Sequence, residues 1–174
     1  MHKSMDQVIL VNEQDEQVGV MEKLQAHVEG QLHRAISVFI FNSKKELLIH
    51  QRAFGKYHSS GLWSNTCCSH PMPGETTEAA ARRRLQEEMG MQCELIKPFS
   101  FIYKAHLDHG LTEFEFDHVF TGHSDAEPVP NSEEVAAWKY INVTDLQTDI
   151  RNNPENYTEW FKICIKNHID ALIR

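Results

Sequence analysis

The chain of 174 residues is long enough to build one hydrophobic core without disulfides. Its formal net charge of −8 argues against broad binding to nucleic acid or to an anionic membrane surface. The four cysteines follow no disulfide framework, and no stretch has the pattern of a signal peptide or membrane span, so we expect a cytoplasmic protein with reduced thiols. Because many chains of this size are monomers, we also expect a monomer.

Short strands are predicted in the first part of the chain. Residues 8–12 and 18–22 are predicted as two strands around a polar turn, and residues 27–32 as a loop. β-Branched and aromatic side chains in residues 34–42 and 46–51 predict a hairpin.

A long loop and a helix are predicted next. Residues 53–75 are rich in Gly, Ser, Pro and His and have the composition of a functional loop. Thr76 or Thr77 is expected to cap a helix that runs to Met89 and ends at Gly90. The remaining predicted elements are strands near residues 94–98, 100–106, 112–123 and 133–141, a short helix capped by Thr144, and a last helix opened by Pro154. This interleaving of strands and helices indicates one α/β or α+β domain over residues 1–174.

One thiol has a polar sequence environment. Cys68 is flanked by Asn, Thr, Ser and His, whereas a structural cysteine is usually flanked by apolar residues. That environment is typical of a cysteine used for chemistry. His70 follows two residues later, and the adjacent Cys67 is a second candidate thiol.

Three carboxylates are expected to share one face of a strand. Residues two apart in a strand point the same way, so Glu113, Glu115 and Asp117 lie opposite Phe114 and Phe116. The alternative is an ordinary strand with one solvated face. If that face is not solvated, the three carboxylates repel one another, and a metal ion would relieve the repulsion.

Three histidines can complete such a metal site. His27, His33 and His70 are each unremarkable alone, but together with Glu113 and Glu115 they offer five nitrogen and oxygen ligands. Such a set suits Zn²⁺, Mn²⁺, Mg²⁺ or iron. A closed structural zinc site would use cysteine pairs at Cys-x-x-Cys spacing, and these are absent from the sequence.

Four cations are candidates for binding a phosphate group. They are Lys23, Arg52, Lys56 and Arg84. The alternative is that they are solvated, with Arg84 paired to Glu88 one helical turn away.

Taken together, these segments resemble the type I isopentenyl-diphosphate isomerases, a branch of the Nudix superfamily. The resemblance runs from Lys23 to Trp160 and is most specific in residues 65–71, 83–90 and 113–115. It implies a Nudix-type α/β/α sandwich with a mixed sheet and an extra N-terminal strand pair.

The resemblance also implies a role for individual residues. It assigns Cys68 and Glu115 as the catalytic pair, with Tyr103 assisting Glu115, and Tyr103 and Trp160 as walls of an isoprenoid pocket. A divalent ion (Mg²⁺, Mn²⁺ or Zn²⁺) would be held by His27, His33, His70, Glu113 and Glu115. A Mg²⁺ ion that bridges to the diphosphate would be held by Glu88 and the main-chain carbonyl of Cys68. Lys23, Arg52, Lys56 and Arg84 would contact the diphosphate.

The implied reaction interconverts isopentenyl and dimethylallyl diphosphate through a tertiary carbocation. We assign Glu115 as proton donor and Cys68 as acceptor, although the sequence leaves that direction open. A Nudix hydrolase of a nucleoside or other diphosphate is the main alternative. Arg84, which stands at one of the Nudix box's glutamates, and the Cys-x-His turn count against it. Ser69 also departs from the box, at its opening glycine. A non-catalytic metal-binding module would leave Cys68 unexplained.

Overall fold

The computed structural model describes residues 6–174, and their strands form one sheet. The strands are β1 (Gln7–Val11), β2 (Gln17–Glu22), β3 (His33–Phe41), β4 (Glu46–Arg52), β5 (Trp63–Ser64), β6 (Cys67–Ser69), β7 (Leu95–His106), β8 (Thr112–His123) and β9 (Val135–Asn142). The helices are α1 (Lys23–Glu29), α2 (Thr77–Met89), α3 (Val143–Asn152) and α4 (Glu159–Leu172).

β3 is the central strand of the sheet. β8 pairs with β3 in parallel, whereas β1, β4 and β6 pair with it antiparallel. β7 adds to β8, and β9 adds to β4, both antiparallel. β1 and β2 form the extra N-terminal pair. The predicted mixed sheet is therefore confirmed.

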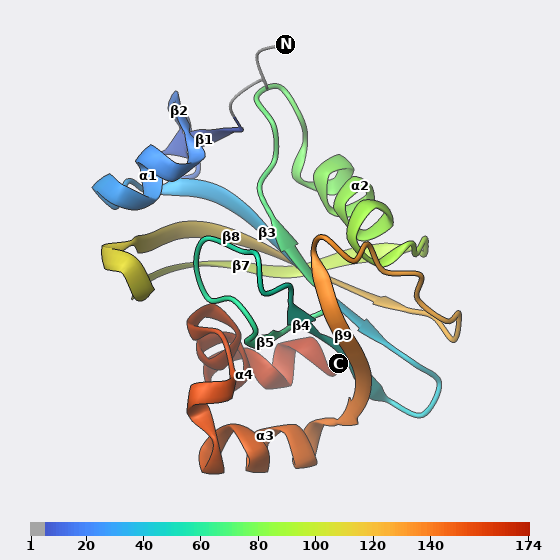
Figure 1. The fold of residues 1–174 in the computed structure, drawn as a ribbon. Coiled ribbons are helices and arrows are strands. Elements are labelled where there is room, and N and C mark those ends of the chain that lie inside the picture. The colour runs from blue at the N-terminus through green and yellow to red at the C-terminus, as the bar shows by residue number, and fades with distance from the viewer. Residues whose placement is uncertain (1–5) are drawn as a thin grey trace.

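Helices cover both faces of this sheet, with α2 on one face and α3 and α4 on the other (Figure 1). Alternate residues of β3 serve the two faces. Ile36 and Val38 lie in the core beneath α2, whereas Phe39 and Phe41 lie in the core beneath α4. The expected α/β/α sandwich is thus confirmed. Within residues 6–174, no helix is long and apolar enough to span a membrane.

The first strand pair, the following hairpin and the long helix all lie where the sequence predicts them. The Thr76 side chain caps α2 by accepting the N–H of Ala79. Gly90 ends the helix at φ 61°, a conformation that glycine adopts without strain.

The prediction of a loop over residues 27–32 is wrong, because α1 extends to Glu29. The Glu22 carboxylate caps this helix by accepting two backbone N–H groups of its first turn. A helix of seven residues is too short to display an apolar period, and glutamate is not among the usual capping residues. For both reasons the sequence does not predict α1.

Two further predictions need correction in the middle of the chain. The loop over residues 53–75 contains the short strands β5 and β6. The two strands expected over residues 94–106 are one strand, β7, whose pairing with β8 shifts between Ile96 and Phe99. Pro98 lies at that shift, where its missing N–H leaves no gap in the ladder.

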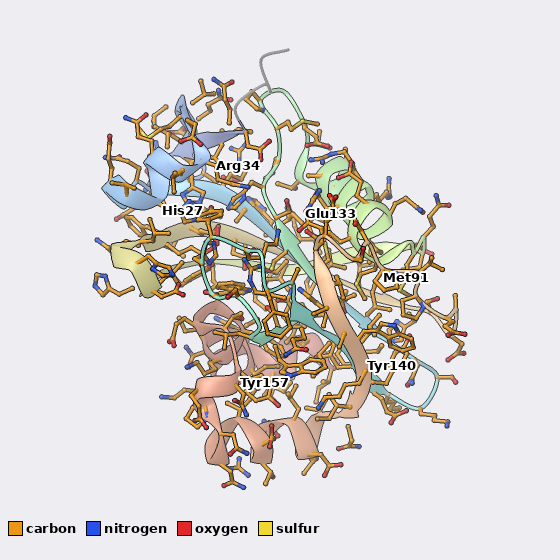
Figure 2. All side chains as sticks on the ribbon, viewed as in Figure 1. His27, Arg34, Met91, Glu133, Tyr140 and Tyr157 are labelled. Atoms are coloured by element: carbon orange, nitrogen blue, oxygen red, sulfur yellow. The ribbon has the colours of Figure 1, made fainter. Side chains whose placement is uncertain are left out.

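Both C-terminal helices begin away from their predicted starts. Asn142, not Thr144, caps α3. Pro154 opens a short 3-10 turn, and α4 begins only at Glu159. The intervening Tyr157 points into the core between α3 and α4, which requires an extended backbone there (Figure 2).

Candidate active site

The sheet and its loops line a partly open cavity of about 290 Å³. Most of the residues singled out from the sequence line it, although they come from separate elements. The predicted site residues on its wall are Lys23, Arg52, Lys56, Cys68, His70, Arg84, Glu88, Glu113, Glu115 and Trp160. His27, His33 and Tyr103 are buried and contact these residues from behind.

Strand β6 places the thiols of Cys67 and Cys68 on opposite faces of the sheet. β6 pairs with β3, where Ser37 lies opposite Cys68 and Val38 opposite Cys67. Successive strand residues point to opposite faces. Cys67 is therefore fully buried in the core beneath α2, whereas Cys68 lines the cavity. Burial raises the pKa of the Cys68 thiol, so that it carries its proton at neutral pH.

Three histidines from three segments converge on the carboxylates of β8. His27 comes from α1, His33 from the start of β3, and His70 from the chain after β6. Their ligand atoms lie within 4.8 Å of one another, as do those of His70, Glu113 and Glu115. The parallel register places His33 beside Glu115.

The shortest contacts in this cluster join nitrogen to nitrogen and nitrogen to oxygen. His70 Nε2 lies 2.8 Å from Glu115 Oε2 and 3.3 Å from His33 Nε2. His27 Nε2 lies 3.9 Å from Glu113 Oε1. The two groups of three overlap at His70, and each is compact enough to hold a cation.

Hydrogen bonds at Nδ1 of two histidines determine which ring nitrogen is free to bind an ion. His27 Nδ1 lies 2.7 Å from the Lys23 carbonyl, and His33 Nδ1 lies 2.8 Å from the Gln31 carbonyl. Because a carbonyl only accepts, both Nδ1 atoms must donate, which leaves the Nε2 lone pairs for an ion. Among the described residues, buried His27 Nε2 and Glu113 Oε2 have no hydrogen-bond partner. The cluster therefore fits a divalent cation.

The charges of the cluster also call for a cation. Burial and the charge of Glu115 raise the pKa of Glu113. Although burial opposes ionisation, the nearby His33 ring and the hydrogen bond from Tyr103 lower the pKa of Glu115. Burial likewise opposes a charge on His27, but its contact with Glu113 raises its pKa.

Tyr103 supports Glu115 from the neighbouring strand. The two residues lie opposite each other across β7 and β8, and the Tyr103 hydroxyl donates to Glu115 Oε1. Burial and the nearby carboxylates raise the pKa of Tyr103, so its proton stays on the hydroxyl. Tyr103 lies behind Glu115 rather than on the cavity wall.

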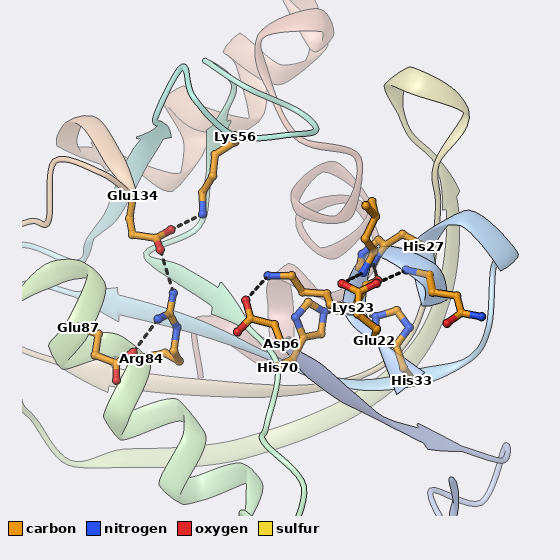
Figure 3. Close-up of polar contacts among 12 residues, drawn as sticks. Asp6, Glu22, Lys23, His27, His33, Lys56, His70, Arg84, Glu87 and Glu134 are labelled. Carbon is orange, nitrogen blue, oxygen red and sulfur yellow. Dashed lines mark hydrogen bonds and ion pairs between the residues drawn. The ribbon is translucent and has the colours of Figure 1, made fainter. Parts of the chain in front are cut away.

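The four candidate cations line the cavity. Three of them, Lys23, Lys56 and Arg84, are already paired with carboxylates (Figure 3). Arg84 contacts Glu88 at 2.5 Å, as the helical spacing predicts, but Glu88 is buried rather than solvated. Arg52 is different: its guanidinium lies 5.3 Å from the Trp160 ring, and its buried Nε has no hydrogen-bond partner within residues 6–174. Burial raises the pKa of Glu88, an effect that Arg84 opposes.

The sequence did not reveal several residues of this site. Glu134 hydrogen-bonds to Lys56 and lies 3.5 Å from Arg84, and Asp6 lies 3.4 Å from Lys23. His58 lines the cavity and stacks on His27 with ring centroids 5.6 Å apart. No motif marks these three residues, because only the folded loops bring them to the cavity.

Asp117 lies on the face of β8 that the alternation predicts, but it is not in the ligand cluster. Its Oδ2 accepts a hydrogen bond of 2.7 Å from the Ser37 hydroxyl. Burial and the charge of Glu115 raise its pKa well above the usual range. The solvated-face alternative is excluded for this strand, since all three carboxylates are buried.

Comparison with solved structures supports the sandwich fold described above. DR0079 from Deinococcus radiodurans superposes with a TM-score of 0.77 at 23% identity, covering 93% of this chain and 99% of that one. A MutT protein from Methanosarcina mazei gives 0.65 at 15% identity, covering 78% and 91%.

Comparison of sequences is more specific. The Nudix domain family matches residues 31–161. The isopentenyl-diphosphate Delta-isomerase 2 of Aromatoleum aromaticum is 55% identical over 95% of this chain and 88% of its own length. The isopentenyl-diphosphate Delta-isomerase of Pectobacterium atrosepticum is 51% identical over 91% and 89%. The chain therefore belongs to the Nudix family and, within it, to the isopentenyl-diphosphate Delta-isomerases.

Proposed function

We propose that this protein interconverts isopentenyl diphosphate and dimethylallyl diphosphate, as a step of isoprenoid biosynthesis. The observation that supports this most strongly is the make-up of one cavity. Two groups able to exchange protons, Cys68 and Glu115, line it together with four cations suited to a diphosphate. Relatives that carry the isomerase name match the chain over nearly its whole length.

The diphosphate is bound by charge. Lys23, Arg52, Lys56 and Arg84 line the cavity and donate to phosphate oxygens. Glu88, with the Cys68 carbonyl, would hold a Mg²⁺ ion that neutralises the remaining phosphate charge.

The apolar part of the substrate lies against Trp160. The Arg52 guanidinium lies 5.3 Å from the centre of this ring, which supports the ring as a site for positive charge. In a dry cavity a face of the ring stabilises a tertiary carbocation by roughly 2 kcal/mol. Water must be excluded, since it would trap the carbocation as an alcohol.

The double bond moves by adding one proton and removing another. Glu115, assisted by the Tyr103 hydroxyl, donates to the terminal alkene carbon, and Cys68 Sγ accepts a proton from the methylene next to the cation. When bound, a divalent ion in the histidine and glutamate cluster supplies positive charge that holds Glu115 in place and tunes its acidity.

The protonation states of the free protein bear on this direction. Burial keeps the proton on Cys68. Although burial opposes ionisation, hydrogen bonds lower the pKa of Glu115. In the free protein Cys68 and Glu115 therefore hold one proton between them, and it lies on the Cys68 sulfur. Forward turnover requires that this proton passes to Glu115 before the substrate reacts.

Deuterium incorporation separates the two directions. If Glu115 protonates the alkene, Cys68→Ala still exchanges deuterium into the terminal carbon of isopentenyl diphosphate without forming product. If Cys68 is the donor, the same variant incorporates none, and the direction proposed here is wrong.

The test of the function is an NMR assay with isopentenyl diphosphate in deuterated water, with and without Mg²⁺. We expect migration of the double bond together with deuterium in the product. Release of phosphate or a monophosphate instead would favour a Nudix hydrolase, which the pairing of Arg84 with the buried Glu88 argues against. We further propose a monomer that acts in the cytoplasm on this small substrate, without nucleic acid or membrane.

A further inference from the structure

Arg84 pairs with Glu87 and Glu88 on its own helix, at 2.6 Å and 2.5 Å. Among the described residues, two carboxylates from other segments also contact the cations of the cavity (Figure 3). Lys56 and Arg84 both point at Glu134: Lys56 donates a hydrogen bond to Oε2, and Arg84 lies 3.5 Å from Oε1. Lys23 lies 3.4 Å from Asp6. Three of the four cations assigned to the diphosphate therefore already have an anion.

The position of Glu134 is fixed by its backbone. Its carbonyl accepts the N–H of Ala53, at the start of the loop that carries Lys56. Its N–H donates to the Asn131 carbonyl, and the Asn131 N–H in turn donates to the Glu88 carbonyl of α2. Glu134 is thus tied to both segments that supply its cations.

Glu134 carries its negative charge in a partly buried environment. Its side chain is 23% exposed, and those of Lys56 and Arg84 are 26% and 18% exposed. Burial opposes ionisation, but Lys56 and Arg84 outweigh burial and lower the pKa of Glu134. Away from bulk water such a charge is weakly screened.

We propose that Glu134 is an internal counter-anion of the diphosphate site. It holds Lys56 and Arg84 in the free protein and must give them up when a diphosphate binds. This competition weakens the binding of substrate and product alike, and so speeds product release. The inference rests on the proposed function, because that function assigns these cations to the diphosphate.

Two comparisons sharpen the inference. Asp6 is 78% exposed, so solvent screens its pairing with Lys23 and its competition is weaker. The opposite role for Glu134, a ligand of the Mg²⁺ ion beside Glu88, predicts the opposite sign, because loss of its charge would then weaken diphosphate binding.

The experiment is calorimetric titration with inorganic diphosphate at fixed Mg²⁺. Glu134→Gln keeps a carbonyl oxygen for Lys56 and removes the charge. We expect its Kd to fall about tenfold, which corresponds to ~1.4 kcal/mol. Asp6→Asn should tighten binding less than threefold. Glu159→Gln is the matched control, because it breaks an exposed pair with Lys162 outside the cavity and should leave Kd unchanged.

Turnover gives an independent readout. With isopentenyl diphosphate, Glu134→Gln should lower KM and kcat together, since product leaves more slowly. A Kd that is unchanged or higher in Glu134→Gln overturns the counter-anion. If that variant does not fold, Glu134→Ala must show the same tightening. A wild-type protein that binds no diphosphate overturns the proposed function as well, whereas binding without competition overturns this inference alone.

Discussion

Replacing each of the two adjacent thiols by alanine should give opposite outcomes. Cys68→Ala should abolish isomerisation and leave the free energy of unfolding nearly unchanged. Cys67→Ala should leave most of the isomerisation activity and lower the free energy of unfolding. The reason is the strand alternation of β6, which points Cys68 into the cavity and Cys67 into the core beneath α2.

The magnitudes follow from these two environments. Loss of a proton-transfer group costs about 10²–10⁴-fold in rate, so kcat of Cys68→Ala should fall by about 10³-fold. Cys67 is 0% exposed and packs with Ile36, Val38 and Leu85. Deleting its sulfur leaves a small cavity that costs about 1–1.5 kcal/mol, or about 2–6 °C in Tm for a chain of this size.

Steady-state kinetics with isopentenyl diphosphate and thermal melting, run on both variants, measure the two effects. Full activity in Cys68→Ala, or loss of activity in a well-folded Cys67→Ala, would refute the assignment. A fall in Tm for Cys68→Ala as large as for Cys67→Ala would refute the packing argument.

Three further predictions follow. Glu115→Gln should abolish turnover, and Tyr103→Phe should lower kcat roughly 10–100-fold with little change in KM, because it removes only a hydrogen bond to Glu115; equal kcat in Tyr103→Phe and wild type would exclude this role. A divalent ion at 100 times its Kd should stabilise chelator-treated protein by about 2.7 kcal/mol, a rise of about 5–10 °C in Tm measured by calorimetry, and His33→Ala should lose that rise. Burial lowers the pKa of His50 from 6.5 to about 4 in the folded protein. Between pH 6.5 and pH 4 only the unfolded chain binds a proton at His50, so the stability that is present above pH 6.5 is lost as the pH falls. Denaturant titrations at pH 7 and pH 5 should therefore show a loss about 2 kcal/mol smaller in His50→Gln than in wild type, and equal losses would contradict the prediction.

Local pattern located much of the fold. The alternation in β8 predicted which face carries Glu113 and Glu115, and Thr76 with Gly90 marked both ends of α2. Patterns failed where the structure depends on distant contacts. Pro154 signals a helix start, but the need to bury Tyr157 delays the helix to Glu159.

The chemistry-bearing residues were visible in the sequence because their types are unusual for their surroundings: a thiol among polar residues, and carboxylates repeated along a strand. Their partners were not visible. Glu134 and Asp6 contact the cations, and His58 stacks on His27, only because loops distant in sequence meet at one cavity.

The sequence by itself determined most of the longer elements, the candidate acid–base and ligand residues, and the resemblance to a family, because these depend on residue type and short spacing. Only the tertiary structure decided which thiol lines the cavity, which cations are already paired and where the protons lie. Those properties depend on burial and on charges from other segments, and no local pattern carries that information.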